Sequence, residues 1–226
     1  SLTFATFAFQ TIYYLIATRY GAWSPTDVMN LDRLETYIPW VAVLLGGAIP
    51  ALMEESISRT FSISFLQKYT KSTVFAVLIS SVIWGLGHAG YPAQPFYIRA
   101  IEVSAMGIFI SWIFIKYGIL ATLIWHFSVD AVYSAMLLLG SNNPYYISTG
   151  LVCAFVVLLP LVYAIIAYKK NGGFIVSDNL VNALDTEIIK EKENSIERID
   201  TETIFEDYRP LSTKRKKVGI VCALIG

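Results

Sequence analysis

The sequence predicts an all-α protein, a polytopic membrane helix bundle of about six transmembrane helices followed by the start of another. Hydrophobic residues make up 55% of the 226 residues, and the mean hydropathy is +0.57. Charged residues make up only 15%, against about 25% in soluble domains. Apolar runs recur along most of the chain, and a membrane span needs about 20 such residues.

The charges are divided unevenly, although the formal net charge is +0. Residues 1–168 carry seven basic and seven acidic side chains, whereas 169–217 carry ten of each. We therefore expect a first membrane helix and polar connector over 1–34, a membrane core over 35–168, and a charged cytoplasmic loop over 169–217. An apolar run over 218–226 predicts the start of a further helix, at the edge of what we interpret as a fragment. Nothing in the sequence predicts a disulfide framework or nucleic-acid binding.

The expected helices follow the apolar runs in chain order: 2–18, 37–68, 70–87, 96–117, 118–139 and 145–168. The second is too long for one straight span, and Gly46, Gly47 and Pro50 predict a kink just before Glu54. The acidic stretch 171–213 has the composition of a solvated linker with one amphipathic helix.

Basic residues predict the orientation of these helices. Lys169, Lys170 and the basic cluster at 214–217 favour the cytoplasmic side, because cytoplasmic loops are enriched in Lys and Arg. Because each expected helix crosses the membrane once, counting crossings back along the chain places the basic loops at 68–71 and at Lys116 on the same side. We expect an integral membrane protein, in the plasma membrane of a prokaryote.

Charged groups occur within the apolar runs, where each costs a few kcal/mol. Glu54 and Glu55 lie in the second helix, and Arg59 follows Glu55 at i,i+4, a spacing that allows an ion pair. Glu54 is rotated by about 100° from Glu55, so it can face the bundle interior. Arg99 and Glu102, at i,i+3 on the fourth helix, are expected to form a salt bridge with each other.

Both histidines of the chain also fall in apolar segments. His88 follows Trp84 by four residues, and His126 precedes Asp130 by four, which places each pair on one helical face. A single histidine in such a place often serves only as a hydrogen-bond partner between helices. Acids and imidazoles on three separate helices instead favour a catalytic pocket.

These motifs resemble the CPBP family of intramembrane endopeptidases, the CAAX protease and bacteriocin-processing (Abi) proteins, which include CAAX prenyl protease type 2. The resemblance rests on Glu54-Glu55-x-x-x-Arg59, Trp84-x-x-x-His88 and His126-x-x-x-Asp130, in this order, within about residues 35–140. Two positions depart from the family pattern. Trp84 stands where Phe is usual, and Asp130 where Asn is common.

The resemblance implies an intramembrane peptidase that hydrolyses peptide bonds. Glu54 would be the general base that activates a water molecule, and His88 would orient that water. His126 and Asp130 would stabilise the oxyanion, and Glu55 and Arg59 would be a supporting pair. Trp84 would be structural support.

An ionised Asp130 cannot donate to an oxyanion. Either the residue is protonated, as in some oxyanion holes, or it accepts from His126 and fixes the tautomer of that ring. We expect the second arrangement.

No cofactor is expected, and zinc is the alternative. Glu54, His88 and His126 have the composition of a His₂Glu catalytic zinc site, although the HExxH signature is absent. The family has been described both as metalloproteases and as metal-free, glutamate-dependent proteases.

The expected partners are the lipid bilayer and a protein or peptide substrate, which is lipidated in the eukaryotic relatives. Two other functions stay open on the sequence. One is a non-catalytic immunity or scaffold protein of the same family. The other is a transporter with a proton relay, which we rank last because the chain has no internal repeat.

Overall fold

The computed structural model describes residues 2–25 and 36–173. Helices account for nearly all of this part of the chain, which confirms the predicted all-α class. The predicted linker, basic cluster and further helix beyond residue 173 lie outside the described residues.

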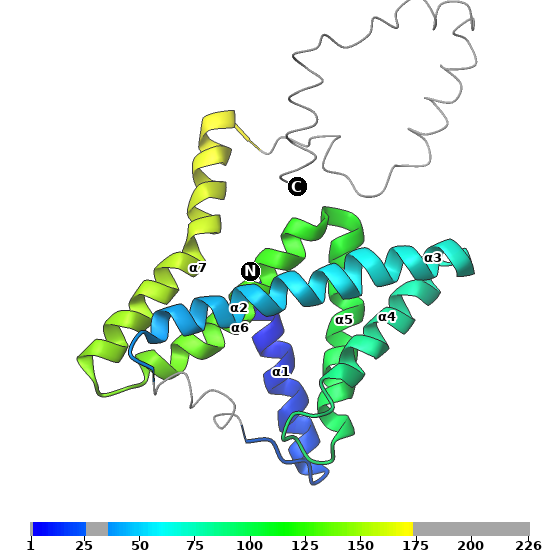
Figure 1. The fold of residues 1–226 in the computed structure, drawn as a ribbon, viewed down its shortest axis with the longest axis horizontal. Helices are drawn as coiled ribbons and strands as arrows, with labels where there is room; N and C mark the ends of the chain where they lie inside the picture. Colours follow the sequence, from blue (N-terminus) through cyan, green and yellow to red (C-terminus); the bar gives the residue numbers. More distant parts are fainter. Residues whose placement is uncertain (1, 26–35, 174–226) are drawn as a thin grey trace, which may run out of the picture. The chain divides into compact units, whose positions relative to one another are not determined.

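The helices follow the order expected from the sequence (Figure 1). Their bounds are α1 Leu2–Arg19, α2 Pro39–Glu55, the π-helix η2 Ser56–Ile63, α3 Ser64–Thr70, α4 Thr73–Gly87, α5 Tyr97–Tyr117, α6 Ile119–Leu139 and α7 Pro144–Asn171. Since α2, η2 and α3 continue one another, the described residues form six helical segments, as predicted.

Local sequence signals set several helix ends. Ser72 caps α4 by accepting a hydrogen bond from the backbone N–H of Phe75, and Asn143 caps α7 by accepting one from Tyr145. Gly118 separates α5 from α6 with φ of +82°, a conformation that favours glycine over residues with a Cβ atom. A single residue therefore separates the two helices.

The long second segment, where a kink was predicted just before Glu54, changes helix type after that residue. The segment stays α-helical through Gly46, Gly47 and Pro50, and becomes π-helical only at Ser56, after Glu54. A π-helix widens the backbone turn and leaves carbonyls with altered partners. The side chain of Ser80 on α4 donates a hydrogen bond to one of them, the carbonyl of Ser58.

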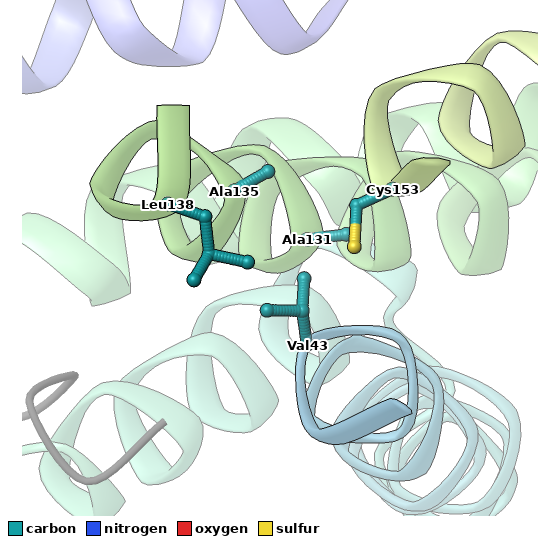
Figure 2. Packing of buried hydrophobic residues seen from close by; sticks show 5 residues of the cluster. All are labelled: Val43, Ala131, Ala135, Leu138 and Cys153. Carbon is teal, nitrogen blue, oxygen red and sulfur yellow. The ribbon is translucent and has the colours of Figure 1, made fainter. Parts of the chain in front are cut away.

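A buried cluster joins α2, α6 and α7. Figure 2 shows its five members, contributed by all three helices: Val43, Ala131, Ala135, Leu138 and Cys153. Small side chains predominate, so the helices approach closely, as is usual where membrane helices associate. This cluster holds the end of α6 that follows His126 and Asp130 against α2.

The contact between α4 and α5 is closer still. A Cβ atom placed on Gly85 would lie 2.0 Å from Oγ of Ser104 and 2.5 Å from the carbonyl oxygen of Ala100. Glycine is thus required for the two helices to pack at this distance. The contact lies one residue after Trp84.

Four segments in the described ranges are long and apolar enough to cross a membrane: Pro39–Thr70, Tyr97–Tyr117, Ile119–Leu139 and Pro144–Asn171. The helix Thr73–Gly87 is apolar but shorter. Large apolar side chains are exposed on every helix, a surface suited to lipid rather than to water. The protein is therefore an integral membrane protein.

Candidate active site

Glu54 and Glu55 end α2 with different surroundings. The side chain of Glu54 is 34% exposed, whereas those of Glu55 and Arg59 are fully buried. A rotation of about 100° between neighbouring residues produces this difference. Glu54 is therefore the carboxylate of the pair that reaches solvent-accessible space.

Glu54 faces both histidines. Its Oε2 atom lies 3.7 Å from Nε2 of His88, at the end of α4, and 4.0 Å from Nε2 of His126, on α6. These distances are too long for direct hydrogen bonds. Groups from three separate helical segments thus converge around Glu54, the convergence that the sequence motifs predicted.

Hydrogen bonds to the other ring nitrogens assign the tautomers. Nδ1 of His88 lies 2.9 Å from the carbonyl oxygen of Trp84, and Nδ1 of His126 lies 2.9 Å from Oε1 of Glu55. A carbonyl and a carboxylate only accept, so both Nδ1 atoms carry the proton. In the neutral rings, the two Nε2 atoms that face Glu54 therefore present lone pairs.

Glu55 has a larger role than the sequence predicted. It lies 3.4 Å from Nε of Arg59, as expected for an ion pair, and it also orients the ring of His126. Asp130 was expected to fix that ring, but its Oδ2 atom lies 3.6 Å from Nε2. The hydrogen bond of 2.9 Å from His126 goes to Glu55, so Glu55 holds the ring.

Trp84 forms a hydrogen bond that the sequence did not predict. Its indole Nε1–H donates to Oε2 of Glu54 at 2.7 Å. The guanidinium of Arg59 lies over the same indole, with Cζ 4.2 Å from the ring centroid. Such a cation–π contact helps to retain a charge away from water.

A second polar group adjoins the first. Arg99 and Glu102 form the expected salt bridge on α5. Glu102 also accepts hydrogen bonds from Gln10 at 2.7 Å and from Tyr14 at 3.3 Å, both on α1. The hydroxyl of Tyr133 donates to Gln10 at 2.7 Å. The three residues outside α5 were not predicted from the sequence to belong to this group.

Both polar groups line a single cavity of about 470 Å³. Its lining includes Glu54, His88, His126 and Asp130, together with Arg99 and Glu102. Cavities of this size hold small molecules or short peptide segments. Within the described ranges, no three His, Cys, Asp or Glu side chains are grouped closely enough to hold a metal ion.

The fold and the site define a helical integral membrane protein with a carboxylate–histidine site between its helices. Residues 36–132 match the family described as type II CAAX prenyl endopeptidase Rce1-like. This match agrees with the family that the motifs predicted, over a segment that contains all three motifs. At the level of the family, it supports a CAAX-type endopeptidase. No curated protein and no solved structure matches the chain.

Proposed function

We propose that this protein is an intramembrane endopeptidase in which Glu54 activates a water molecule. The observation that supports this is the approach of Glu54 Oε2 to Nε2 of both histidines, at 3.7 and 4.0 Å. Carboxylate and imidazole groups at such separations can share one water molecule, since each would be within hydrogen-bonding reach of it.

The tautomers suit this arrangement. A water molecule bound between Glu54 and His88 would donate one proton to the carboxylate and the other to the Nε2 lone pair of the ring. The oxygen lone pairs of the water would then remain for attack on a substrate carbonyl carbon. His88 would thus orient the nucleophile, and Glu54 would take its proton as the new C–O bond forms.

The surroundings of His126 would allow this ring to stabilise the oxyanion. Glu55 at 2.9 Å and Asp130 at 3.6 Å surround the ring with negative charge, which favours its imidazolium form. An imidazolium donates from Nε2 while Nδ1 remains bonded to Glu55. In the second step, Glu54 would return its proton to the leaving amide nitrogen as the C–N bond breaks, which yields an acid and an amine.

Zinc is the alternative to this metal-free mechanism. The donor types match such a metal, because Glu54, His88 and His126 supply one carboxylate and two bare Nε2 atoms, although these groups would have to move closer together to bind it. Hydrogen bonds from Nδ1 to a carbonyl and a carboxylate are also common behind zinc-binding histidines. A bound zinc would lower the barrier by acidifying a water molecule and polarising the substrate carbonyl.

The substrate class proposed is a membrane-associated peptide, lipidated or not. A suitable probe is a farnesylated CAAX-type peptide with a fluorophore and a quencher on opposite sides of the cleavage region. The same peptide without the farnesyl group tests whether the lipid is recognised. Metal analysis of the purified protein, with a chelator control on cleavage, separates the two mechanisms.

The decisive variant is Glu54→Gln, which keeps the size of the side chain but removes the base. We expect cleavage to fall by at least about 10²-fold, because general base catalysis typically contributes that much. The amount of folded protein should stay unchanged, as judged by gel filtration in detergent. The matched control Gln67→Glu changes a similar side chain in α3, on an exposed surface. Retained cleavage by Glu54→Gln would overturn the role of Glu54 as the base, whereas a wild-type protein that cleaves neither peptide would favour the non-catalytic and transporter functions.

A further inference from the structure

Trp84 contacts four groups of the proposed site, namely Glu54, Arg59, His88 and His126. Its indole N–H donates to Glu54, and its backbone carbonyl accepts from His88. Its ring lies edge-on to both imidazoles, with centroid distances of 5.2 Å to His88 and 6.0 Å to His126. One residue therefore determines where three reacting groups lie relative to one another.

Arg59 lies over the ring of the same indole. The guanidinium is fully buried over the ring, and none of its nitrogens has a hydrogen-bond acceptor among the described residues. Its charge is balanced by Glu55 at 3.4 Å. A buried guanidinium is costly unless it is paired, so the stacking with Trp84 and the ion pair with Glu55 reinforce each other.

Glu54 depends on Trp84 for its orientation. The bond from the indole, at 2.7 Å, is the one direct hydrogen bond to the Glu54 carboxylate within the described part of the chain. The side chain is 34% exposed and has three rotatable bonds. Without this donor, the carboxylate would be free to turn away from the two histidines.

We propose that Trp84 is a positioning residue: Arg59 fixes its ring, and its indole N–H holds Glu54 toward the two histidines. This inference rests on the proposed role of Glu54 as the base. A phenylalanine at this position would fill similar space but could not donate, so the function assigned to Trp84 belongs to its N–H group and not to its bulk.

The test compares Trp84→Phe with Trp112→Phe in the full chain. Both variants remove an indole N–H and keep an aromatic ring. Trp112 is a matched control, because it is half-exposed on α5 and also has a cation, Lys116, over its ring at 5.3 Å. With the farnesylated peptide as probe, we expect Trp84→Phe to lower kcat at least about tenfold while KM stays within about twofold. Trp112→Phe should match the wild type.

A second measurement needs no substrate. In protein carrying isotope-labelled tryptophan, the indole N–H signal of Trp84 is identified by its absence from Trp84→Phe or Trp84→Tyr, whichever folds. Glu54→Gln replaces a charged acceptor by a neutral one, so it should shift this signal and leave that of Trp112 in place. The measurement separates a hydrogen bond to Glu54 from a loss of packing.

The outcomes are distinct. A Trp84→Phe variant with wild-type kcat overturns the positioning role. An indole N–H signal of Trp84 that stays at the same position in Glu54→Gln also overturns it. Retained cleavage by Glu54→Gln overturns the proposed role of Glu54 as the base, on which the role of Trp84 rests. An inactive Glu54→Gln beside a fully active Trp84→Phe overturns only the role assigned to Trp84.

Discussion

Two neighbouring residues with the same charge have different surroundings and contacts in this site. Glu54 and Glu55 differ by one helical step, yet the first opens onto the cavity and the second is fully buried between Arg59 and His126. The i,i+4 spacing and the helical rotation predicted this division from the sequence. The contacts made across helices were beyond such reasoning. No local pattern predicts that Nδ1 of His126 meets Glu55, or that the indole of Trp84 meets Glu54.

Asp130 offers a prediction at this scale. Since Glu55 already holds the His126 ring, Asp130 acts on Nε2 from 3.6 Å, where its negative charge and its acceptor oxygen favour a proton on that atom. Asp130→Asn keeps the acceptor, so we expect activity within about fivefold of the wild type. Asp130→Ala loses both features and should reduce kcat by about 10²-fold, the typical cost of a weakened oxyanion donor.

The measurement is cleavage of the quenched peptide at saturating substrate, after both variants have been shown to elute as the wild type does. An inactive Asn variant would contradict the assignment, because it would mean that the charge itself is required.

At the level of the elements, the helix order could be predicted well and the helix contacts could not. Apolar runs and breaker residues predicted six helical segments close to their actual ends. The polar face of α1 was missed, although Thr6, Gln10 and Tyr14 recur every four residues and indicate one helical face. The partner of Gln10 and Tyr14, Glu102 of α5, depends on how two distant helices pack. The π-helix after Glu54 likewise has no sequence signal that we recognise.

Gly85 supplies a prediction for the α4–α5 contact. Gly85→Ala would place a methyl group 2.0 Å from Oγ of Ser104 and 2.5 Å from a backbone carbonyl, and the carbonyl cannot rotate away. We expect destabilisation by about 1–3 kcal/mol or more, as for other overpacked sites. Thermal unfolding in detergent, followed by tryptophan fluorescence, measures this change.

Gly87→Ala is the matched control, since a Cβ atom there meets nothing within 4 Å. It lies on the same helix and should leave the unfolding temperature unchanged or slightly raised. Equal effects of the two substitutions would mean that helix propensity, and not the close approach of α5, decides stability here.

For the whole molecule, the positive-inside rule predicts which ends of the helices share a side of the membrane. Lys68 lies in the last turn of α3 and Lys71 directly after that helix. Lys116 lies near the end of α5, and Lys169 and Lys170 lie at the end of α7. If each helical segment crosses the membrane, all these positions fall on one side. The turn at 141–143, between α6 and α7, falls on the other.

Cysteine labelling tests this orientation. In a background with Cys153→Ala and Cys222→Ala, single cysteines are introduced by Lys116→Cys and Asn142→Cys. We expect a membrane-impermeant maleimide to label Asn142→Cys from outside intact cells, and Lys116→Cys only after the membrane is opened. Labelling of both from outside would contradict the predicted topology.

The length of α4 has a consequence for how a substrate reaches the site. At 15 residues, the helix rises about 22 Å, whereas the hydrocarbon core of a membrane is about 30 Å thick. With Thr73 at one boundary, His88 lies about 8 Å short of the opposite boundary, below the lipid headgroups. An extended chain covers this depth in about two or three residues. A substrate of the proposed endopeptidase would therefore reach the site in extended form, with a few residues inside the bilayer.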